Sequence, residues 1–324
     1  MTGIEHYQSR ISEALERIQF PQEPAELYEP IRYTLALGGK RMRPVLVLMG
    51  ADLLGGNLDD VINPALGIEV FHNFTLLHDD IMDEAPLRRG KATVHTKWNS
   101  NIAILSGDVM FVESCRLVSK APAKVLSPVL EVFYKAAGDV CEGQQWDMNF
   151  EAQENVSLPD YLKMIRLKTA VLLGASLQIG ALCANANEKD AALLYEFGCH
   201  LGVAFQLQDD VLDVFGDPAV FGKQAGGDIL SNKKTYLKLR ALEKANPSEL
   251  AELKNWYSSR SFPAQEKVVA VTRIFENLQV REDAEKEMNS HLNVALEALK
   301  SVNGDPAKIH ALEKFAYQLM DRVK

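Results

Sequence analysis

Apolar residues recur at intervals of three and four positions through most of this 324-residue chain, and this periodicity limits the folds open to it more than any other property. Near the C-terminus, for example, Met288, Leu292, Ala295 and Leu299 follow one another at helical spacing. Such spacing gathers apolar side chains on one face of a helix. The strict alternation that indicates a half-buried strand is scarce. The sequence therefore predicts an all-α protein.

Helix starts are visible where a capping residue stands before a proline, as in Asn246-Pro247 and Asp305-Pro306. The Asn or Asp side chain can accept hydrogen bonds from the first turn, and the backbone angle of proline suits the first helical position. We find no Gly/Ser-rich or Pro-rich linker and no repeat at the periods typical of solenoid proteins. We therefore expect a single helical domain over residues 1–324.

Composition excludes several classes of function. Lys and Arg number 35 against 44 Asp and Glu. The net charge of -9 argues against non-specific electrostatic binding to nucleic acid or to an anionic lipid surface. The four cysteines lack C-x-x-C spacing, and residues 1–19 lack the apolar stretch of a secretory signal. We expect free thiols, a cytoplasmic location and no stable membrane insertion, since the longest uncharged run, 169–187, is rich in small residues that suit an interior helix.

Two copies of the pattern D-D-x-x-D stand in apolar helical contexts, at positions 79–83 and 209–213. On a helix, the first and last aspartates of each copy project from one face, one turn apart. Like charges at this spacing destabilise a helix by roughly 0.2–0.5 kcal/mol per pair, so we expect a cation to compensate them. Carboxylate oxygens with open positions favour Mg²⁺. The candidate metal ligands are Asp79, Asp80, Asp83, Asp209, Asp210 and Asp213.

Basic residues are grouped close to both motifs. They are Lys40, Arg41, Arg43, Arg88, Arg89, Lys168, Lys223 and Lys233. A lone D-D-x-x-D is equally consistent with a solvated acidic helix end, but that alternative explains neither the second copy nor the neighbouring cations. A site of mixed sign suits metal ions that bridge carboxylates to a polyanion while basic side chains neutralise the rest. Diphosphate is the natural ligand.

At these residues the sequence resembles the trans-isoprenyl diphosphate synthases, the polyprenyl synthetase family. Five motifs occur in the family's order: G-G-K-x-x-R-P at 38–44, the first aspartate motif with its following R-R-G at 79–90, K-T at 168–169, F-Q-x-x-D-D-x-x-D at 205–213, and G-K-x-x-G-x-D-I with a downstream lysine at 222–233. The resemblance covers nearly the whole chain. It implies a homodimer in which each chain is a bundle of antiparallel helices around a deep central cavity.

The resemblance also implies a role for each matching residue. The aspartates would hold Mg²⁺, three ions per active site, against the diphosphate of an allylic substrate. That diphosphate would be contacted by Arg88, Lys168, Thr169, Gln206, Lys223 and Lys233, and isopentenyl diphosphate by Lys40, Arg43, His72 and Arg89. His72 stands where the family has His or Gln, and a helix histidine in ordinary packing is the alternative.

The implied reaction is ionisation of the allylic diphosphate, condensation with isopentenyl diphosphate and elimination of a proton. It gives a short-chain all-trans product, geranylgeranyl or farnesyl diphosphate. The sequence contains no Ser-His-Asp or Cys-His arrangement, and this chemistry needs no protein nucleophile. The residues expected at the reacting centre are Asp79, Asp209, Lys168, Thr169 and Gln206. The backbone carbonyls near Lys168 and Thr169 and the Gln206 amide would stabilise the carbocation with the negative ends of their dipoles.

Product length should depend on the depth of the cavity. Phe74 lies five residues before Asp79, about 7–8 Å along the helix axis, and its ring is the candidate floor. Thr75 beside it is small, and Phe71 lies about one turn deeper as a second barrier. A bulky residue at this position is similar to the short-chain pattern of the family. Ordinary core packing is the alternative.

Three other activities stay open at this point. A longer-chain polyprenyl diphosphate synthase would share every motif. A class I terpene cyclase also begins with a metal-bound aspartate motif, but usually carries a different second motif and would not need a second basic segment. A non-catalytic helical subunit of a synthase would typically have lost one aspartate motif, whereas this chain keeps both.

Overall fold

The structure is a computed structural model that describes residues 4–216, 226–258 and 262–321. Helices make up nearly all of its regular structure, which confirms the predicted all-α class. The elements are α1 (Ile4–Glu16), α2 (Ala25–Ala36), α3 (Met42–Leu53), α4 (Leu58–Met82), β1 (Leu87–Arg88), β2 (Lys91–Ala92), α5 (Val94–Lys97), α6 (Ser100–Val118), α7 (Leu126–Ala152), α8 (Leu158–Ile165), η1 (Arg166–Ala170), α9 (Val171–Cys183), α10 (Glu188–Phe215), α12 (Gly227–Leu230), α13 (Tyr236–Lys244), α14 (Pro247–Ser258), α15 (Ala264–Asn277), α16 (Val280–Lys300) and α17 (Pro306–Met320).

The chain divides into two compact units, and all but one of their boundaries fall within helices. Unit 1 comprises residues 1–134, 175–195 and 302–311, and unit 2 comprises 135–174, 196–301 and 312–324. No linker segment coincides with these boundaries, which lie inside α7, α9, α10 and α17 and after α16. The expectation of a single domain over residues 1–324 stays a prediction.

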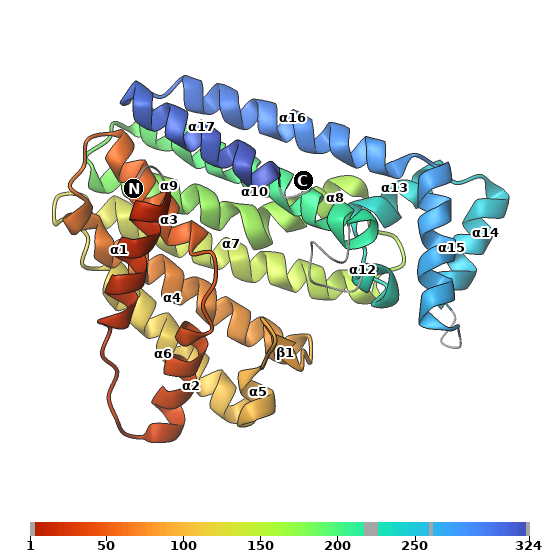
Figure 1. The fold of residues 1–324 in the computed structure, drawn as a ribbon, viewed down its shortest axis with the longest axis horizontal. Helices are drawn as coiled ribbons and strands as arrows, with labels where there is room; N and C mark the ends of the chain where they lie inside the picture. Colours follow the sequence, from red (N-terminus) through yellow and green to blue (C-terminus); the bar gives the residue numbers. More distant parts are fainter. Residues whose placement is uncertain (1–3, 217–225, 259–261, 322–324) are drawn as a thin grey trace. The chain divides into compact units, whose positions relative to one another are not determined.

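In unit 1, α4 packs against α6 and α3, and α4 and α6 run side by side in Figure 1. Its core includes Leu66, Val70 and Leu77 from α4 together with Met110 from α6. The antiparallel pair β1–β2 joins α4 to α5 and carries Arg88. The first aspartate motif therefore lies at the C-terminal end of a helix that is packed into the core of unit 1.

In unit 2, α13 packs against α8 and α16, and α15 packs against α12 and α14 (Figure 1). Buried side chains from these helices form one core with the end of α10, including Leu207, Leu237, Leu253 and Phe275. This core includes Val211 and Val214, within and next to the second aspartate motif, and Ile229 of α12.

Both predicted helix starts are confirmed. The side chain of Asn246 accepts hydrogen bonds from the backbone N–H groups of Ser248 (2.9 Å) and Glu249 (3.0 Å), and α14 begins at Pro247. The side chain of Asp305 accepts from the N–H of Ala307 at 2.8 Å, and α17 begins at Pro306. Capping of this kind contributes about 1 kcal/mol per helix.

A continuous helical run from Leu158 to Cys183 is long and apolar enough to cross a membrane by length and composition. Of its most apolar 18-residue window, 67% is buried inside the protein, as in the core helix of a globular protein. The run also contains a five-residue π-helix, η1, and π-helical insertions are frequent at functional sites.

Candidate active site

The first aspartate motif occupies the end of α4. Asp80 is buried, and the Arg88 guanidinium holds both of its carboxylate oxygens, with Nε–Oδ distances of 2.8 and 2.9 Å. Asp79 is half-buried, whereas Asp83 is the exposed C-cap residue, one turn farther along. Carboxylates are unfavourable here because the C-terminal end of a helix carries negative partial charge. The motif therefore concentrates negative charge that a cation would relieve.

Four arginines of unit 1 surround His72. Arg43 Nη1 lies 3.1 Å from Nε2 of His72. Burial, with the positive charges of Arg43, Arg89, Arg88 and Arg41, holds the pKa of His72 well below its usual range, so the imidazole is neutral. Burial also lowers the pKa of Arg43 to about 10, which leaves it charged at neutral pH. This arrangement matches an anion site in which His72 orients Arg43.

Glu69 and Asn73, two residues that the sequence argument missed, hold Arg41. The Arg41 guanidinium donates to Glu69 at 2.5 Å and to the Leu35 carbonyl at 2.7 Å, and the Asn73 amide donates to the same Glu69 oxygen at 2.9 Å. Glu69 is almost fully buried. A buried carboxylate in an otherwise apolar helix is the signal that could have identified it.

The glycine pair before this cluster allows Arg89 to approach. Gly39 has a φ of 132°, and a Cβ added there would lie 2.7 Å from a guanidinium nitrogen of Arg89. Arg89 also donates to the carbonyl of Gly38. Lys40, the next residue, is exposed. Three of the four residues predicted for isopentenyl diphosphate, Arg43, His72 and Arg89, therefore lie in one cluster.

The second aspartate motif lies near the end of α10 in unit 2, and its three carboxylates differ. Asp210 is buried and accepts hydrogen bonds from the Tyr161 hydroxyl, the Tyr236 N–H (3.1 Å) and the Gln206 amide (3.4 Å). Burial raises the pKa of Asp210 to about 7 despite these donors. Asp213 accepts from the N–H of Asp228 at 2.8 Å, whereas Asp209 is half-buried. Asp210 and Asp213 therefore also organise the protein around them.

Lys168 and Thr169 lie in the π-helix η1. The Lys168 ammonium donates to Asp147 on α7 at 2.6 Å, and the Thr169 hydroxyl donates to the Gln206 amide oxygen at 3.3 Å. A cavity of about 210 Å³ is lined by these four residues together with Tyr161, Met164, Ile165, Asp210, Asp228, Lys233, Lys234 and Thr235. Unit 2 thus gathers cations, carboxylates and neutral dipoles around one space, as the sequence predicted for Lys168, Thr169, Gln206 and Lys233. Lys223, the remaining predicted contact, lies outside the described residues.

The donor chemistry of the aspartates fits Mg²⁺. Asp79 and Asp83 offer hard carboxylate oxygens one helical turn apart, and Mg²⁺ is usually held by one or two carboxylates plus water and substrate phosphate. Across residues 4–216, 226–258 and 262–321, no three His, Cys, Asp or Glu side chains form a group that could hold a metal ion. Asp80 and Asp210, with their protein partners, fit a supporting role around such an ion better than direct ligation.

Phe74 and Phe71 belong to an aromatic cluster in unit 1. The Phe74 ring lies 4.7 Å from the His78 ring, 5.5 Å from Phe111 and 5.6 Å from Phe71, measured between centroids. Phe71 is fully buried and also contacts Phe133 at 5.5 Å. The Thr75 hydroxyl donates to the His72 carbonyl at 2.9 Å. Phe111 and Phe133 come from α6 and α7, so sequence spacing along α4 did not indicate them.

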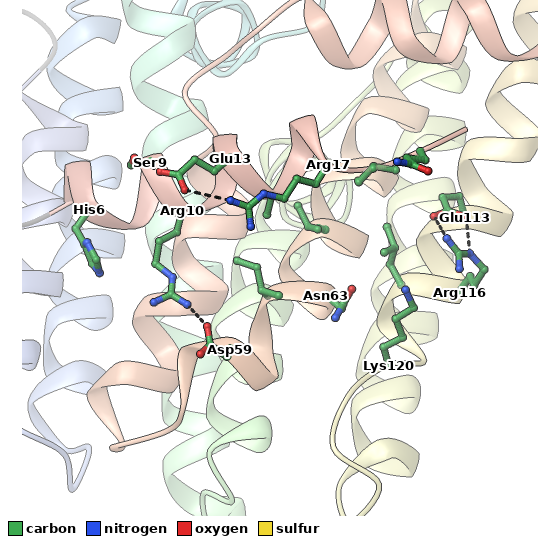
Figure 2. Close-up of a pocket in the computed structure, with 16 residues that line it drawn as sticks. His6, Ser9, Arg10, Glu13, Arg17, Asp59, Asn63, Glu113, Arg116 and Lys120 are labelled. Atoms are coloured by element: carbon green, nitrogen blue, oxygen red, sulfur yellow. Dashed lines mark hydrogen bonds and ion pairs between the residues drawn. The ribbon is translucent and has the colours of Figure 1, made fainter. Parts of the chain in front are cut away.

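A larger pocket, of about 930 Å³, lies among α1, α4 and α6 (Figure 2). Its lining includes none of the residues predicted for the site. Its arginines already pair with neighbouring carboxylates, Arg10 with Asp59, Arg17 with Glu13 and Arg116 with Glu113. The candidate site is therefore identified by the residues that line it and not by the volume of the pocket.

An all-α protein with clustered arginines in one unit, a lysine-lined cavity in the other and an aspartate motif in each has the properties of an enzyme that acts on diphosphates. Residues 24–275 match the polyprenyl synthetase family. A geranylgeranyl diphosphate synthase of Methanosarcina mazei is 39% identical over 74% of this chain and 75% of its own length. A geranylfarnesyl diphosphate synthase of Natronomonas pharaonis is 36% identical over 74% and 78%.

Solved structures agree with these relatives. A crystal structure of a geranylgeranyl pyrophosphate synthase, 43% identical, covers 100% of both chains with a TM-score of 0.95. A polyprenyl synthase of Caulobacter crescentus, solved with calcium and isoprenyl diphosphate, is 28% identical over 99% of this chain and 96% of its own, with a TM-score of 0.87. This chain belongs to the polyprenyl synthetase family. It is a trans-prenyltransferase whose substrates are isoprenoid diphosphates.

Proposed function

We propose that this enzyme condenses isopentenyl diphosphate with an allylic diphosphate to give geranylgeranyl diphosphate. The observation that carries the proposal is the presence of two separate basic clusters, one around His72 in unit 1 and one around Lys168 in unit 2, which suits two diphosphate substrates. The names of its relatives support geranylgeranyl as the product.

The arginine cluster is assigned to isopentenyl diphosphate. Arg43, oriented by neutral His72, and Arg89, positioned over Gly39, would neutralise this diphosphate with Lys40. Arg41 is neutralised by buried Glu69, so its role is to build the cluster rather than to bind the ligand. Isopentenyl diphosphate does not ionise, and the site needs only to hold it.

The allylic diphosphate is assigned to the cations of unit 2, Lys168 and Lys233, with Arg88 and the aspartates. Asp79 and Asp83, with Asp209, would hold Mg²⁺, and bound Mg²⁺ would neutralise charge on the departing diphosphate. Three ions per site are part of the proposal. Asp80 holds Arg88 in place and Asp210 holds the turn that precedes Tyr236, so both act by positioning.

The residues of unit 2 also explain how an allylic carbocation could persist. The Thr169 hydroxyl and the Gln206 amide oxygen line the cavity and present negative dipole ends without a nucleophilic charge. Met164 and Ile165 supply apolar lining that disfavours water. No protein base is invoked, because the released diphosphate can accept the proton.

The purified chain should form a C20 diphosphate from isopentenyl diphosphate and dimethylallyl, geranyl or farnesyl diphosphate when Mg²⁺ is present. Chromatography of the dephosphorylated alcohols measures the product, and EDTA should abolish it. A cyclic hydrocarbon would identify a terpene cyclase, a longer alcohol a long-chain synthase, and no turnover with any primer a non-catalytic subunit. Any of these three results would overturn the proposal.

We also propose a homodimer and a cytoplasmic location. The four cysteines, all in the described part of the chain, form no disulfide bond, which supports a reducing compartment. On α6, the large apolar side chains Ile104, Leu105 and Val112 are exposed. Tyr134, the last residue of α7 that belongs to unit 1, is exposed as well. Large exposed apolar groups on one helix favour an interface.

Val112→Glu should therefore convert the dimer to a monomer, because it places a charge in an apolar interface. Sedimentation analysis would measure this change. Val294→Glu on α16, where the valine is also exposed, is the matched control and should leave the mass unaltered. A wild-type chain that sediments as a monomer would contradict the assembly.

A further inference from the structure

Unit 2 contains buried lysines whose ammonium groups contact an asparagine and a tyrosine ring. Lys238 on α13 and Lys267 on α15 are each only 7% exposed. Within the described part of the chain, neither they nor nearby Lys234 lie within ion-pair distance of an Asp or Glu. Burial, reinforced by Lys234 and Lys267, lowers the pKa of Lys238 to about 8. Burying an unpaired charge costs several kcal/mol, so these lysines need a functional explanation.

Both lysines donate to the same residue. The Lys238 ammonium donates to the backbone carbonyl of Asn232 at 2.8 Å, and the Lys267 ammonium donates to the side-chain oxygen of Asn232. The Tyr257 ring of α14 completes the arrangement, with Lys238 Nζ 3.8 Å and Lys267 Nζ 5.3 Å from its centroid. The attraction between an ammonium group and an aromatic face offsets part of the burial cost. Lysines of α13 and α15 thus meet at one exposed asparagine, and Tyr257 of α14 packs against both lysines.

Asn232 has a left-handed conformation, with a φ of 59°, in the turn that leads into Lys233. The rest of this segment is anchored on both sides. Asp213 accepts from the N–H of Asp228, and Asp210 accepts from the N–H of Tyr236. The contacts to Asn232 therefore fix the part of the turn that lies between the two aspartate anchors.

We infer that Lys238 and Lys267 are positioning residues that clamp Asn232 and thereby present Lys233 to the allylic diphosphate. This inference rests on the proposed function, which assigns Lys233 to that ligand. The two buried ammonium groups also add positive potential at the turn without contacting the ligand. Asparagine suits position 232 because it tolerates positive φ and supplies an acceptor to Lys267.

The test measures binding of inorganic diphosphate with Mg²⁺ by calorimetry, together with steady-state kinetics. Lys267→Met and Lys238→Met remove the donated hydrogen bond and the charge but keep an extended side chain. Each should weaken diphosphate binding and raise the KM for the allylic substrate by about tenfold or more, since small displacements of a binding group have effects of this size. The KM for isopentenyl diphosphate should change less than twofold. Lys267→Arg, which keeps a donor, should restore part of the affinity.

Lys254→Met is the matched control, because Lys254 is an exposed lysine on α14, the helix that carries Tyr257. It should leave both constants unchanged. Asn232→Gly supplies a second variant should either buried substitution fail to fold, since glycine keeps positive φ but removes the acceptor of Lys267. It should reproduce the defect of Lys267→Met, and combining the two substitutions should add little further loss.

Folded Lys267→Met and Asn232→Gly variants with wild-type diphosphate affinity would overturn the inference, as would an equal rise in the KM of both substrates. Failure of the proposed function has a different signature. In that case the wild-type protein would bind diphosphate but condense nothing, and the calorimetric comparison among the variants would still decide whether the clamp acts.

Discussion

At the scale of single residues, the first aspartate motif places function in conflict with stability. Asp79 and Asp80 lie in the last turn of α4 and Asp83 caps it, where the helix macrodipole makes a carboxylate unfavourable. Asp59 and Asp60, in the first turn of the same helix, lie where a carboxylate is favourable. Carboxylates at the two ends of α4 are therefore expected to affect stability in opposite directions.

Asp83→Asn should stabilise the metal-free protein while it impairs catalysis. Removing the charge should raise the free energy of unfolding by about 0.3–1 kcal/mol. Losing an oxygen ligand should lower turnover by about 10²–10³-fold. Urea denaturation in EDTA and steady-state assays with Mg²⁺ measure the two effects. Asp60→Asn, at the other end of α4, should do the opposite: slightly lower stability with normal turnover.

Phe74→Ala should lengthen the main product. The ring that packs between Phe111 and His78 would be lost, and the hydrocarbon chain could extend toward Phe71. Stability should also fall, by up to about 3 kcal/mol, because the ring is partly buried. Chromatography of the products reports the change in length, and Phe74→Leu, which keeps most of the volume, should retain the wild-type product. An unaltered profile in a folded Phe74→Ala variant would contradict the floor assignment.

The sequence predicted the residues that carry charge but not those that position them. Asp79, Asp209, Arg43 and Lys168 stand in recognisable motifs. Glu69 holds Arg41, Asp147 holds Lys168 and Tyr161 holds Asp210. These partners come from distant turns or other helices and have no local pattern of their own. Spacing likewise groups Asp80 and Asp210 with the predicted metal ligands, but it does not show that both are buried and hydrogen-bonded to protein groups. Their role as metal ligands stays a prediction.

At the scale of elements, the helical periodicity predicted the helices, and the capping residues Asn246 and Asp305 predicted two of their starts. The periodicity could not predict η1, because a π-helix adds one residue to a turn without changing the apolar character of the helical run from Leu158 to Cys183. Close tertiary packing accompanies this insertion. A Cβ at Gly143 of α7 would lie 2.3 Å from the backbone N of Lys168, so the two helices approach more closely there than side chains allow.

Gly143→Ala should displace η1 and with it Lys168 and Thr169. We expect a loss of about 1–3 kcal/mol in stability from overpacking and a fall in turnover of about 10²-fold from misplaced groups. Thermal unfolding and steady-state kinetics measure these effects. Gly138→Ala is the control on the same helix, because nothing lies within 4 Å of a Cβ there. That change should stabilise the protein by about 0.5–1 kcal/mol through helix propensity, with normal turnover.

At the scale of the whole molecule, the net charge of -9 hides a strongly uneven distribution. Arginines concentrate around His72, and lysines concentrate around Asn232 and Lys168. An acidic protein can in this way bind polyanionic substrates while repelling nucleic acid in general. The composition predicted the lack of general affinity for nucleic acid, whereas only the motifs indicated binding of polyanionic substrates.

The global stability should fall in mild acid because of one half-buried pair of histidines in unit 2. His200 on α10 and His291 on α16 lie with their Nδ1 atoms 2.9 Å apart, which requires one neutral ring to donate to the other. Burial, together with the positive charge of Arg166, lowers the pKa of His200. Burial, with His200 and Arg166, lowers the pKa of His291 to about 4. The unfolded chain therefore binds protons that the folded chain excludes, and stability is lost as pH falls from about 6.5 toward 4.

Urea denaturation at pH 7.5 and pH 5 measures this loss, which we expect to be about 1–2 kcal/mol after allowance for the solvent contact the rings retain. Asp210 acts in the opposite direction over the same range, because its raised pKa favours the protonated folded state in acid. The histidine contribution is therefore isolated by comparison with a His200→Gln, His291→Gln double variant, which keeps Asp210. Wild type should lose more stability than the variant between the two pH values. Equal losses would show that the pair does not exclude protons in the folded state.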